Sequence, residues 1–301
     1  MRANIIFIAA LERSGSTILD LILGTHRQIV SFGEVERVIK PHGADIKESL
    51  NRPCNCGEIV SNCPFWSIVI KRIIDNPDAT DLSSRYHHFI QVFQEQYGDN
   101  TLAIDSSKNI RALNAIANTT KGKIIVLHTV RDVRSWTYSV RRAGSGKAEM
   151  PWSKVLSKDF NLHWKAFARH RILRLLPGWL MNEWAIRNYR IQYNIQTDNR
   201  LKCYNLSYEE LALAPQKTLK ALTNFLEVDD FKGELSVDSL ESHIVRGNRA
   251  AFRKEILFPP RYDYEWLTSY KVLVNFTLLP YLRRLNNIWV YRLLNRTRNQ
   301  S

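Results

Sequence analysis

The stretch that decides the fold is IIFIAALERSGSTILDLIL, residues 5–23. Its first part, Ile5–Ala10, is a continuous apolar run bounded by a polar turn, which predicts a strand buried on both faces of a sheet. The turn Glu12–Thr17 is rich in small and hydroxyl residues, and Ile18–Leu23 beyond it has helical character. A strand, a tight turn and a helix in this order form a common phosphate-binding unit.

Three further apolar runs have the same character, at 101–104, 123–129 and 201–206. Helical segments separate them, so the sequence predicts an α/β protein with a P-loop-like three-layer fold, in which helices flank a central, mostly parallel sheet. Asp105–Lys108 and Arg131–Asp132 follow directly on two of these runs. Because open α/β sheets bind ligands beyond the carboxyl ends of their strands, we expect a site there.

The chain of 301 residues is long enough for one large α/β domain or two small ones, and 45% hydrophobic residues can fill a sizeable core. No linker rich in Gly, Ser or Pro interrupts it, which favours a single domain over 1–301. Residues 36–98, between the first two strands, form a candidate lid or acceptor insert with helices at 64–74 and 82–97. A helical extension is expected at 265–298.

The formal net charge of +14 favours anionic partners, among them a phosphate-rich nucleotide, an acidic glycan, nucleic acid and an anionic membrane. The N-terminal apolar run is too short to cross a bilayer, and no later window has about 18 uncharged apolar residues. We therefore expect a cytoplasmic protein. Basic residues beside an apolar stripe at 271–298 permit peripheral membrane contact, but a helix packed on the domain is the preferred interpretation.

The first candidate anion site is Arg13-Ser14-Gly15-Ser16-Thr17. A small-residue turn that enters a helix directs free N–H groups and the positive end of the helix at an anion, and hydroxyl groups and one cation complete the cradle. The Walker A spacing is absent, because Arg precedes the Ser-Gly pair and no Lys follows a second Gly. The plain alternative is an ordinary serine N-cap on an exposed turn.

The second candidate site combines Arg131 with Ser139, eight residues later. Arg131 at a strand end offers a planar, permanently charged fork suited to a phosphate monoester, and a helix can bring the Ser139 hydroxyl to the same oxygens. Taken separately, each has a plain alternative: Arg131-Asp132 as a helix cap, and Ser139 as a solvated helix residue.

Together these two sites resemble the donor site of sulfotransferases that use 3′-phosphoadenosine 5′-phosphosulfate. The 13–17 turn resembles the family's 5′-phosphosulfate loop, and Arg131 with Ser139 resembles its paired 3′-phosphate ligands. Further similar segments follow in the family's order over residues 4–255, and the pattern is closest to the bacterial branch related to tyrosylprotein sulfotransferases. These segments are Phe32-Gly33-Glu34, Cys54-Asn55-Cys56-Gly57 with Cys63-Pro64-Phe65-Trp66, Asp105–Lys108, Tyr208–Leu211 with Pro215 and Phe225-Leu226, and His243 with Gly247-Asn248.

The resemblance implies roles for these residues. Glu34 would be the base that accepts the acceptor proton, and Lys108 and Arg13 would stabilise charge on the leaving 5′-phosphate. Tyr208, Gly247 and Asn248 would belong to the donor site. The plain alternatives are a surface pair of Glu34 with Arg37 and a solvated Lys108.

The chain departs from the family at Ala251, where relatives usually carry a basic residue. Arg249 and Arg253 flank that position, and either could contact the donor phosphate. The donor's charges can be met by side chains and amides, so no metal is expected. The acceptor is expected to be a hydroxyl of a glycan, a lipid or a small metabolite.

Three of the four cysteines, Cys54, Cys56 and Cys63, lie close together in sequence. They could hold zinc if His42 or another residue supplied a fourth ligand, but C-x-C is not the usual zinc knuckle. A segment of paired or free thiols is the more economical interpretation. His243 could act as a second acid or base, or be a hydrogen-bonded structural residue.

Two other function classes share part of this pattern. A kinase or nucleotide hydrolase would use the same strand, turn and helix, but would need magnesium ligands and a donor with a γ-phosphate. A non-catalytic nucleic-acid binder would account for the positive charge and the many aromatic residues. Because the basic residues are scattered and no nucleic-acid motif is present, we expect no nucleic-acid partner.

Overall fold

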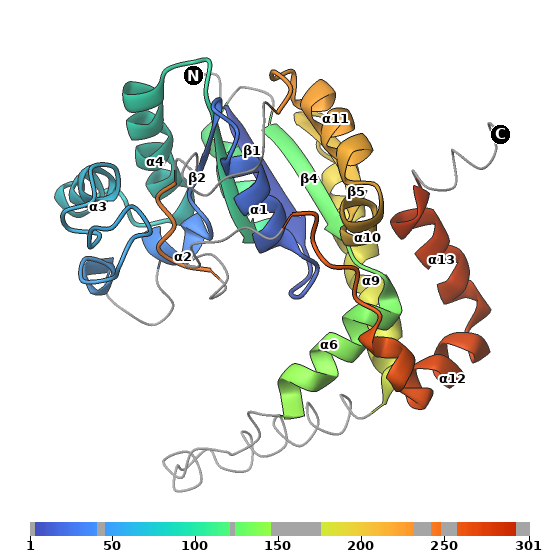
Figure 1. Ribbon diagram of the computed structural model, residues 1–301. Helices are drawn as coiled ribbons and strands as arrows, with labels where there is room; N and C mark the ends of the chain where they lie inside the picture. The colour runs from blue at the N-terminus through green and yellow to red at the C-terminus, as the bar shows by residue number, and fades with distance from the viewer. Residues whose placement is uncertain are drawn as a thin grey trace, which may run out of the picture.

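The computed structural model describes residues 4–40, 46–120, 124–145, 176–231, 242–247 and 258–292. Its centre is a five-stranded sheet in the order β2-β3-β1-β4-β5, in which every neighbouring pair is parallel (Figure 1). The strands are β1 Ile5–Ala10, β2 Ile29–Ser31, β3 Leu102–Lys108, β4 Ile124–Val130 and β5 Leu201–Ser207. Helices cover both faces of this sheet, which confirms the predicted α/β class.

The four expected strands are all present, and a fifth, β2, was not predicted from the sequence. It has only three residues, Ile29–Ser31, so it leaves little periodic signal. Strand β3 continues beyond the expected end at Ile104, because its last residue still pairs with β1: Ala9 lies opposite Lys108 after a register shift. This longer β3 brings Lys108 to the edge where β1 enters its turn.

Alternate residues of β1 point into two separate cores, one on each face of the sheet. Ile6 and Ile8 pack into the smaller core with Leu19, Ile22 and Leu222. The helices of that core are α1 Ser16–Gly24, α10 Tyr208–Leu213 and α11 Pro215–Leu226. The larger core, on the other face, receives Ile5, Phe7 and Ala9 together with side chains of α4 Leu82–Tyr97, α5 Ile110–Thr119, α6 Val133–Ser145 and α9 Pro177–Gln196.

The segment between β2 and β3 contains α2 Val35–Ile39, the short 3-10 helix η1 Ile46–Ser49, α3 Trp66–Asp75 and α4. Helices α3 and α4 confirm the two that were expected at 64–74 and 82–97. Four fully buried aromatic rings join this segment to the sheet, with Phe32 of the β2 end in contact with Phe65, Trp66 and Phe89. The insert therefore packs against the sheet through a cluster of buried aromatic rings.

The described C-terminal part contains the 3-10 helix η4 Glu265–Thr268, α12 Tyr270–Leu278 and α13 Pro280–Val290. Val272, Leu282 and Val290 are buried, and the buried Asn286 donates to Asp132 Oδ2 at 2.9 Å and accepts from the Val133 N–H at 2.9 Å. These contacts fix the described part of the extension to the domain, as the preferred interpretation of a packed helix predicts.

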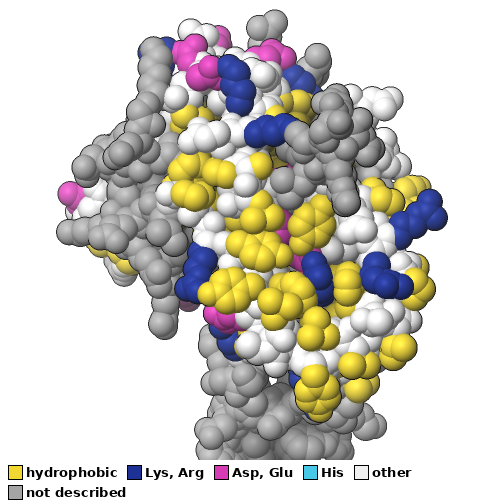
Figure 2. Space-filling model, turned by 45° about the vertical axis from the view of Figure 1, so that its right-hand side comes forward, with side chains coloured by type: hydrophobic (Ala, Val, Ile, Leu, Met, Phe, Trp, Pro, Cys, Tyr) yellow, Lys and Arg dark blue, Asp and Glu magenta, His cyan; other side chains and the backbone are white. Residues whose placement is uncertain are grey.

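The outward side of this extension carries several exposed hydrophobic side chains. Tyr270 is 70% and Leu278 is 71% exposed, and Tyr281 and Ile288 are exposed as well. Figure 2 shows hydrophobic side chains interspersed with Lys and Arg on the face that includes these helices. Across the described ranges, no helix combines the length and the hydropathy that crossing a bilayer requires.

Candidate active site

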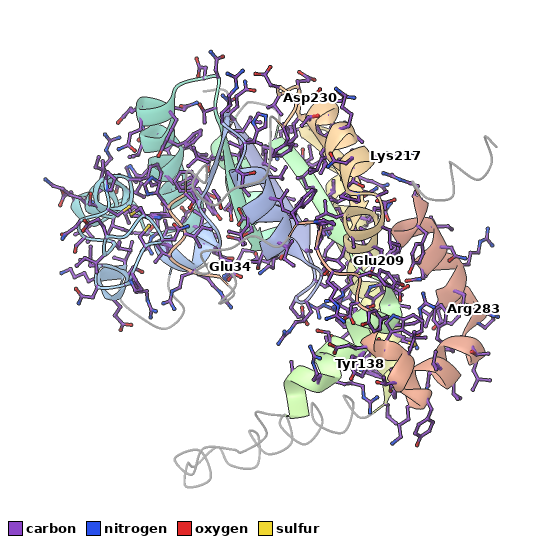
Figure 3. The ribbon with its side chains drawn as sticks, in the orientation of Figure 1. Glu34, Tyr138, Glu209, Lys217, Asp230 and Arg283 are labelled. Carbon is purple, nitrogen blue, oxygen red and sulfur yellow. The ribbon has the colours of Figure 1, made fainter. Side chains whose placement is uncertain are left out.

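The candidate site lies at the carboxyl edge of the sheet, because every strand is parallel and therefore ends there. Glu34 follows β2, Lys108 ends β3, the 13–17 turn follows β1 and Arg131 follows β4. Figure 3 shows Glu34 and Glu209, which follow strands on opposite sides of β1, at this one edge. The topology thus gathers residues that are nearly 200 positions apart in sequence.

The turn after β1 has the backbone shape of an anion cradle. Arg13 (φ 68°) and Gly15 (φ 86°) both adopt left-handed conformations, which are uncommon for a residue such as Arg. Gly15 is the N-cap of α1, and no side chain caps the helix. The Ile18 N–H donates to the Gly15 carbonyl at 3.0 Å, which leaves the N–H groups of Ser16 and Thr17 for an anion. The Ser14 hydroxyl is buried and has no partner among the described residues. The serine N-cap alternative is therefore wrong.

Tyr208 at the start of α10 lies directly against this turn. A Cβ added to Gly15 would meet Tyr208 Cδ2 at 2.6 Å, so only glycine allows the ring to come this close. The Tyr208 hydroxyl donates to the Arg261 carbonyl at 2.6 Å, and burial raises the pKa of the phenol. The Arg131 guanidinium lies over the same ring, 4.9 Å from its centroid.

Arg131 of the second candidate site is in direct contact with the first candidate site, the 13–17 turn. Its Nη1 donates to the Arg13 carbonyl at 2.8 Å, and its Nη2 forms an ion pair with Asp263. Its Nε is buried without a partner among the described residues. Ser139 lies on α6 and is 8% exposed; it is one helical turn beyond Ser135, whose hydroxyl donates to the Asp263 carbonyl at 3.2 Å. Arg131 therefore contacts both the 13–17 turn and the Asp263 segment, and Ser139 lies on the same face of α6 as Ser135.

Glu34 is held between two cations. Its Oε1 is 2.6 Å from Lys108 Nζ, and its Oε2 is 2.7 Å from Arg37 Nη1. The pair with Arg37 was anticipated as the plain alternative, but the pair with Lys108 was not, and it places both candidate catalytic residues in direct contact. Lys108 is largely buried and also has a left-handed backbone (φ 72°), so the solvated-cation alternative is wrong.

The segment 242–247 fixes the position of the Glu34 main chain. Gly33 has a left-handed backbone (φ 66°), and its lack of a side chain lets the 242–247 segment approach closely. A Cβ at this position would meet the Arg246 carbonyl oxygen at 2.7 Å. The Glu34 N–H donates to that same carbonyl at 3.1 Å, and the Gly33 carbonyl accepts from the Ser106 N–H at 2.7 Å. Gly247, a predicted donor-site residue, is therefore next to Glu34 in space, whereas Asn248, Arg249 and Arg253 lie outside the described residues.

Two buried acids support the strand ends behind the site. Asp105 accepts hydrogen bonds from the Tyr86 hydroxyl at 2.6 Å and the Ser107 N–H at 2.8 Å, and burial raises its pKa from 3.8 to about 7. Asp20 of α1 accepts from the Ser106 hydroxyl at 2.7 Å, and burial raises its pKa to about 6. These contacts hold the β3 end against α1 and α4.

A shallow cavity of about 330 Å³ opens beside Lys108. Glu12, Arg187, Arg190 and Ile191 are among its lining residues. Arg187 forms an ion pair with Glu12 at 2.6 Å, which joins α9 to the 13–17 turn. The cavity thus adjoins both the turn and a candidate catalytic cation.

Two residues of this site were missed in the sequence. Asp263 pairs with Arg131 from 132 positions away, and Arg246 contributes the carbonyl that holds Glu34. The pKa of Arg246 is lowered by desolvation and by the neighbouring charges of Arg52 and Arg37. Neither residue lies in a local motif, so only their contacts in the folded chain reveal them.

The geometry offers two places where anionic groups can bind. A cradle with unused N–H groups and a buried hydroxyl suits one anion, and the partly unsatisfied guanidinium of Arg131, stacked on Tyr208, suits a second. Glu34 and Lys108 add a carboxylate and a cation in direct contact, and these are residue types that proton transfer and charge stabilisation require.

Comparison with known proteins identifies a family. Solved structures with similarity include a sulfotransferase domain from the Synechococcus PCC 7002 olefin synthase, at 17% identity over 90% of this chain and 85% of that one, with a TM-score of 0.44. A sulfotransferase domain from the curacin biosynthetic pathway is 18% identical over 92% of this chain and 98% of that one, with a TM-score of 0.43.

Mouse sulfotransferase SULT7A1, solved as a complex with PAP, is 14% identical over 100% of this chain and 90% of that one, with a TM-score of 0.48. Curated proteins gave no match. The model of the sulfotransferase family matches residues 5–232, which include the 13–17 turn, Glu34, Lys108, Arg131 and Tyr208. By this match over most of its length, the chain belongs to the sulfotransferase family.

Proposed function

We propose that this sulfotransferase transfers the sulfuryl group of 3′-phosphoadenosine 5′-phosphosulfate to an acceptor hydroxyl by in-line displacement. The observation that carries the proposal is the contact between the two candidate anion sites, in which Arg131 Nη1 lies 2.8 Å from the Arg13 carbonyl oxygen. One nucleotide can therefore reach both the turn and the Arg131 fork. Membership of the sulfotransferase family supports this class of donor.

The donor supplies an activated sulfuryl group and a phosphate leaving group. We assign its 5′ end to Arg13, Ser14, Gly15, Ser16 and Thr17, where the unused N–H groups and the unpaired Ser14 hydroxyl can bind oxyanions. We assign its 3′-phosphate to Arg131 and Ser139. Tyr208 shapes the space between them, because its ring contacts both Gly15 and Arg131.

We propose that Glu34 is the general base and Lys108 the residue that stabilises charge on the leaving group, aided by Arg13. Glu34 Oε1 and Lys108 Nζ are 2.6 Å apart, so a shift of Lys108 toward the donor would release that oxygen to accept the acceptor proton. Arg37 on the other oxygen keeps the carboxylate in place. This division of roles gives each of the two paired residues one task.

We further propose one domain over residues 1–301, in which the 36–98 insert forms one wall of the acceptor site. The cavity beside Lys108 supplies an adjoining entry. The acceptor class remains the one expected from the sequence, a hydroxyl of a glycan, lipid or small metabolite. Peripheral membrane contact would use the exposed Tyr270 and Leu278 with the exposed basic residues Arg283 and Arg284.

The test is transfer of radiolabelled sulfate from the donor onto fractionated lipids, glycans and metabolites. Adenosine 3′,5′-bisphosphate should compete with the donor, and adenosine triphosphate should not, because it lacks a 3′-phosphate for Arg131. If adenosine triphosphate competes equally well, the chain is better described as a kinase-like enzyme. Calorimetry that shows no heat with the bisphosphate would reject the proposed donor site.

A further inference from the structure

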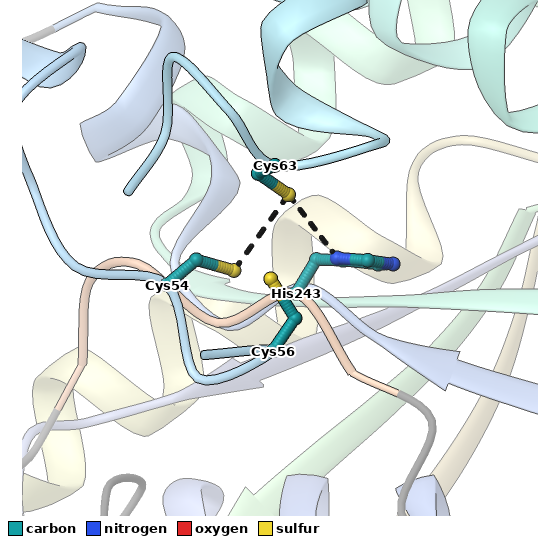
Figure 4. A group of neighbouring side chains, drawn as sticks. All are labelled: Cys54, Cys56, Cys63 and His243. Carbon is teal, nitrogen blue, oxygen red and sulfur yellow. Dashed lines mark hydrogen bonds between the residues drawn. The ribbon is translucent and has the colours of Figure 1, made fainter. Parts of the chain in front are cut away.

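Four potential metal ligands converge at the base of the insert, although they come from two distant segments. Cys54, Cys56 and Cys63 lie between the β2 region and α3, and His243 lies in the segment 242–247. Their ligand atoms all fall within 4.8 Å of one another. Figure 4 shows the three sulfur atoms and the imidazole directed at one common space.

Two distances inside this cluster are close to those of a tetrahedral zinc site. Cys54 Sγ and Cys63 Sγ are 3.8 Å apart, and Cys63 Sγ is 3.3 Å from His243 Nδ1. Bonds of roughly 2.3 Å to sulfur and 2.0 Å to nitrogen at tetrahedral angles place two sulfurs about 3.7 Å apart and a sulfur and a nitrogen about 3.5 Å apart. A single ion at the centre would therefore meet the ligands with small adjustments.

The ring of His243 is oriented for this role. Its Nε2 lies 3.0 Å from the Tyr97 hydroxyl, so the other nitrogen, Nδ1, is the one presented to the sulfurs. Its main chain is fixed as well, since its N–H donates to the Ser31 carbonyl at 2.7 Å and its carbonyl accepts from Trp66 Nε1 at 2.5 Å. The imidazole is thus held by β2, α3 and α4.

Main-chain hydrogen bonds also fix the loop that carries Cys54 and Cys56. The Cys54 N–H donates to the Glu58 carbonyl at 2.8 Å, and the Gly57 N–H donates to the Cys54 carbonyl at 3.1 Å. Asn55 joins this loop to the second segment in both directions: its N–H donates to the Ile244 carbonyl at 3.0 Å, and its Oδ1 accepts from the Ile244 N–H at 2.6 Å. The site geometry is therefore built into the fold.

The alternative roles for these thiols explain less. A disulfide joins two sulfurs and would leave the third thiol and the oriented imidazole without a purpose. A reactive thiol needs access, but Cys63 is 0% and Cys54 is 4% exposed. Cys56 is exposed, so it closes the site from the solvent side.

We propose that Cys54, Cys56, Cys63 and His243 bind one structural Zn²⁺ ion. Four protein ligands leave no open position for a reacting water, which makes the site structural. From the sequence, no metal was expected, because only three cysteines lie together and no fourth ligand was evident. His42, considered there as a fourth ligand, lies outside the described residues. The fold instead supplies His243, which is 180 positions from Cys63. The ion would fasten the insert to the segment whose Arg246 carbonyl holds Glu34.

The test is metal analysis of the full-length chain, purified without added metal or chelator, by inductively coupled plasma mass spectrometry. We expect about one zinc atom per chain, and close to none in Cys56→Ser, a variant that removes an exposed ligand without opening a core cavity. Cys203→Ser, outside the cluster, is the matched control and should keep its zinc. Tyr97→Phe should weaken zinc binding about 10- to 100-fold, because it removes the partner of Nε2.

Replacement by Co²⁺ gives a second readout that does not depend on activity. The wild-type chain should show the intense visible bands of tetrahedral cobalt bound to thiolates, and Cys56→Ser should lose them. A metal-free chain whose melting temperature is unchanged by chelator would overturn the proposal, as would a Cys54–Cys63 disulfide in the purified protein. None of these results depends on sulfuryl transfer, so the zinc site and the proposed function can fail separately.

Discussion

Glu34 and Lys108 form an ion pair with 2.6 Å between Oε1 and Nζ, although 74 residues separate them in sequence. The contact exists because β2 and β3 are parallel neighbours with Ser31 opposite Ile104, so the residues that follow β2 run beside the last residues of β3. It places the candidate base and the candidate cation of the reaction within one hydrogen bond, so variants of either residue can separate proton transfer from donor binding.

Glu34→Gln should lower turnover by about 10²- to 10⁴-fold, because an amide cannot accept the acceptor proton. Donor affinity should change little, since the donor contacts assigned above come from the 13–17 turn and Arg131. Steady-state kinetics with calorimetric donor titration measures both quantities. Glu36→Gln is the control, because Glu36 is a buried carboxylate two residues on that pairs with Arg111. An equal collapse of donor binding in Glu34→Gln would assign Glu34 a structural role.

Arg131→Ala should weaken binding of adenosine 3′,5′-bisphosphate by about 2 to 4 kcal/mol, the range of a charged hydrogen bond that loses one partner. Isothermal titration calorimetry provides the measurement. Arg284→Ala removes the same charge from the exposed surface of α13 and should leave affinity unchanged. Equal affinities in the two variants would move the 3′-phosphate away from Arg131.

Asp263→Asn should tighten binding of the bisphosphate about 5-fold, because the Asp263 carboxylate occupies the Arg131 fork that the phosphate would use. The substitution keeps the main-chain contacts of Asp263 with Ser135 and Trp266. Titration in parallel with the wild-type chain measures the change. Weaker binding would show instead that Asp263 orients Arg131 for the phosphate.

Asp105 should make the folded chain less stable as pH rises. Burial raises its pKa from 3.8 to about 7, so between these values the folded state keeps a proton that the unfolded state has lost. The free energy of unfolding therefore falls as pH rises from about 4 to about 7, by up to roughly 1.4 kcal/mol for each unit of pKa shift, and levels off above that range. Asp20, whose pKa is raised to about 6, contributes in the same direction.

Asp105→Asn should flatten part of this dependence, because a neutral amide of the same shape replaces the titrating group. Urea denaturation at pH 5 and pH 8 measures the difference in the free energy of unfolding. The exposed Asp78→Asn serves as the control. If wild type and Asp105→Asn lose stability equally between the two pH values, Asp105 is not the group responsible.

The sequence by itself determined the sheet class and the turn between β1 and α1. Four continuous apolar runs predicted four of the five strands, and the 13–17 turn followed from small residues placed between a strand and a helix. Local signals suffice there, because burial on both faces and a tight turn each restrict residue type at adjacent positions. The strand β2, with three residues, was too short for such a signal.

Only the tertiary structure decided which of these residues meet. The ion pair of Glu34 with Lys108, the contact of Arg131 with Asp263 and the approach of His243 to three cysteines all join segments that are 74 to 189 positions apart. Strand order and register determine which of these side chains come into contact. Both depend on packing of the whole chain rather than on any local pattern. The physical reason is that a side chain's nearest neighbours in a parallel sheet come from other strands, whose place in the order no short stretch of sequence encodes.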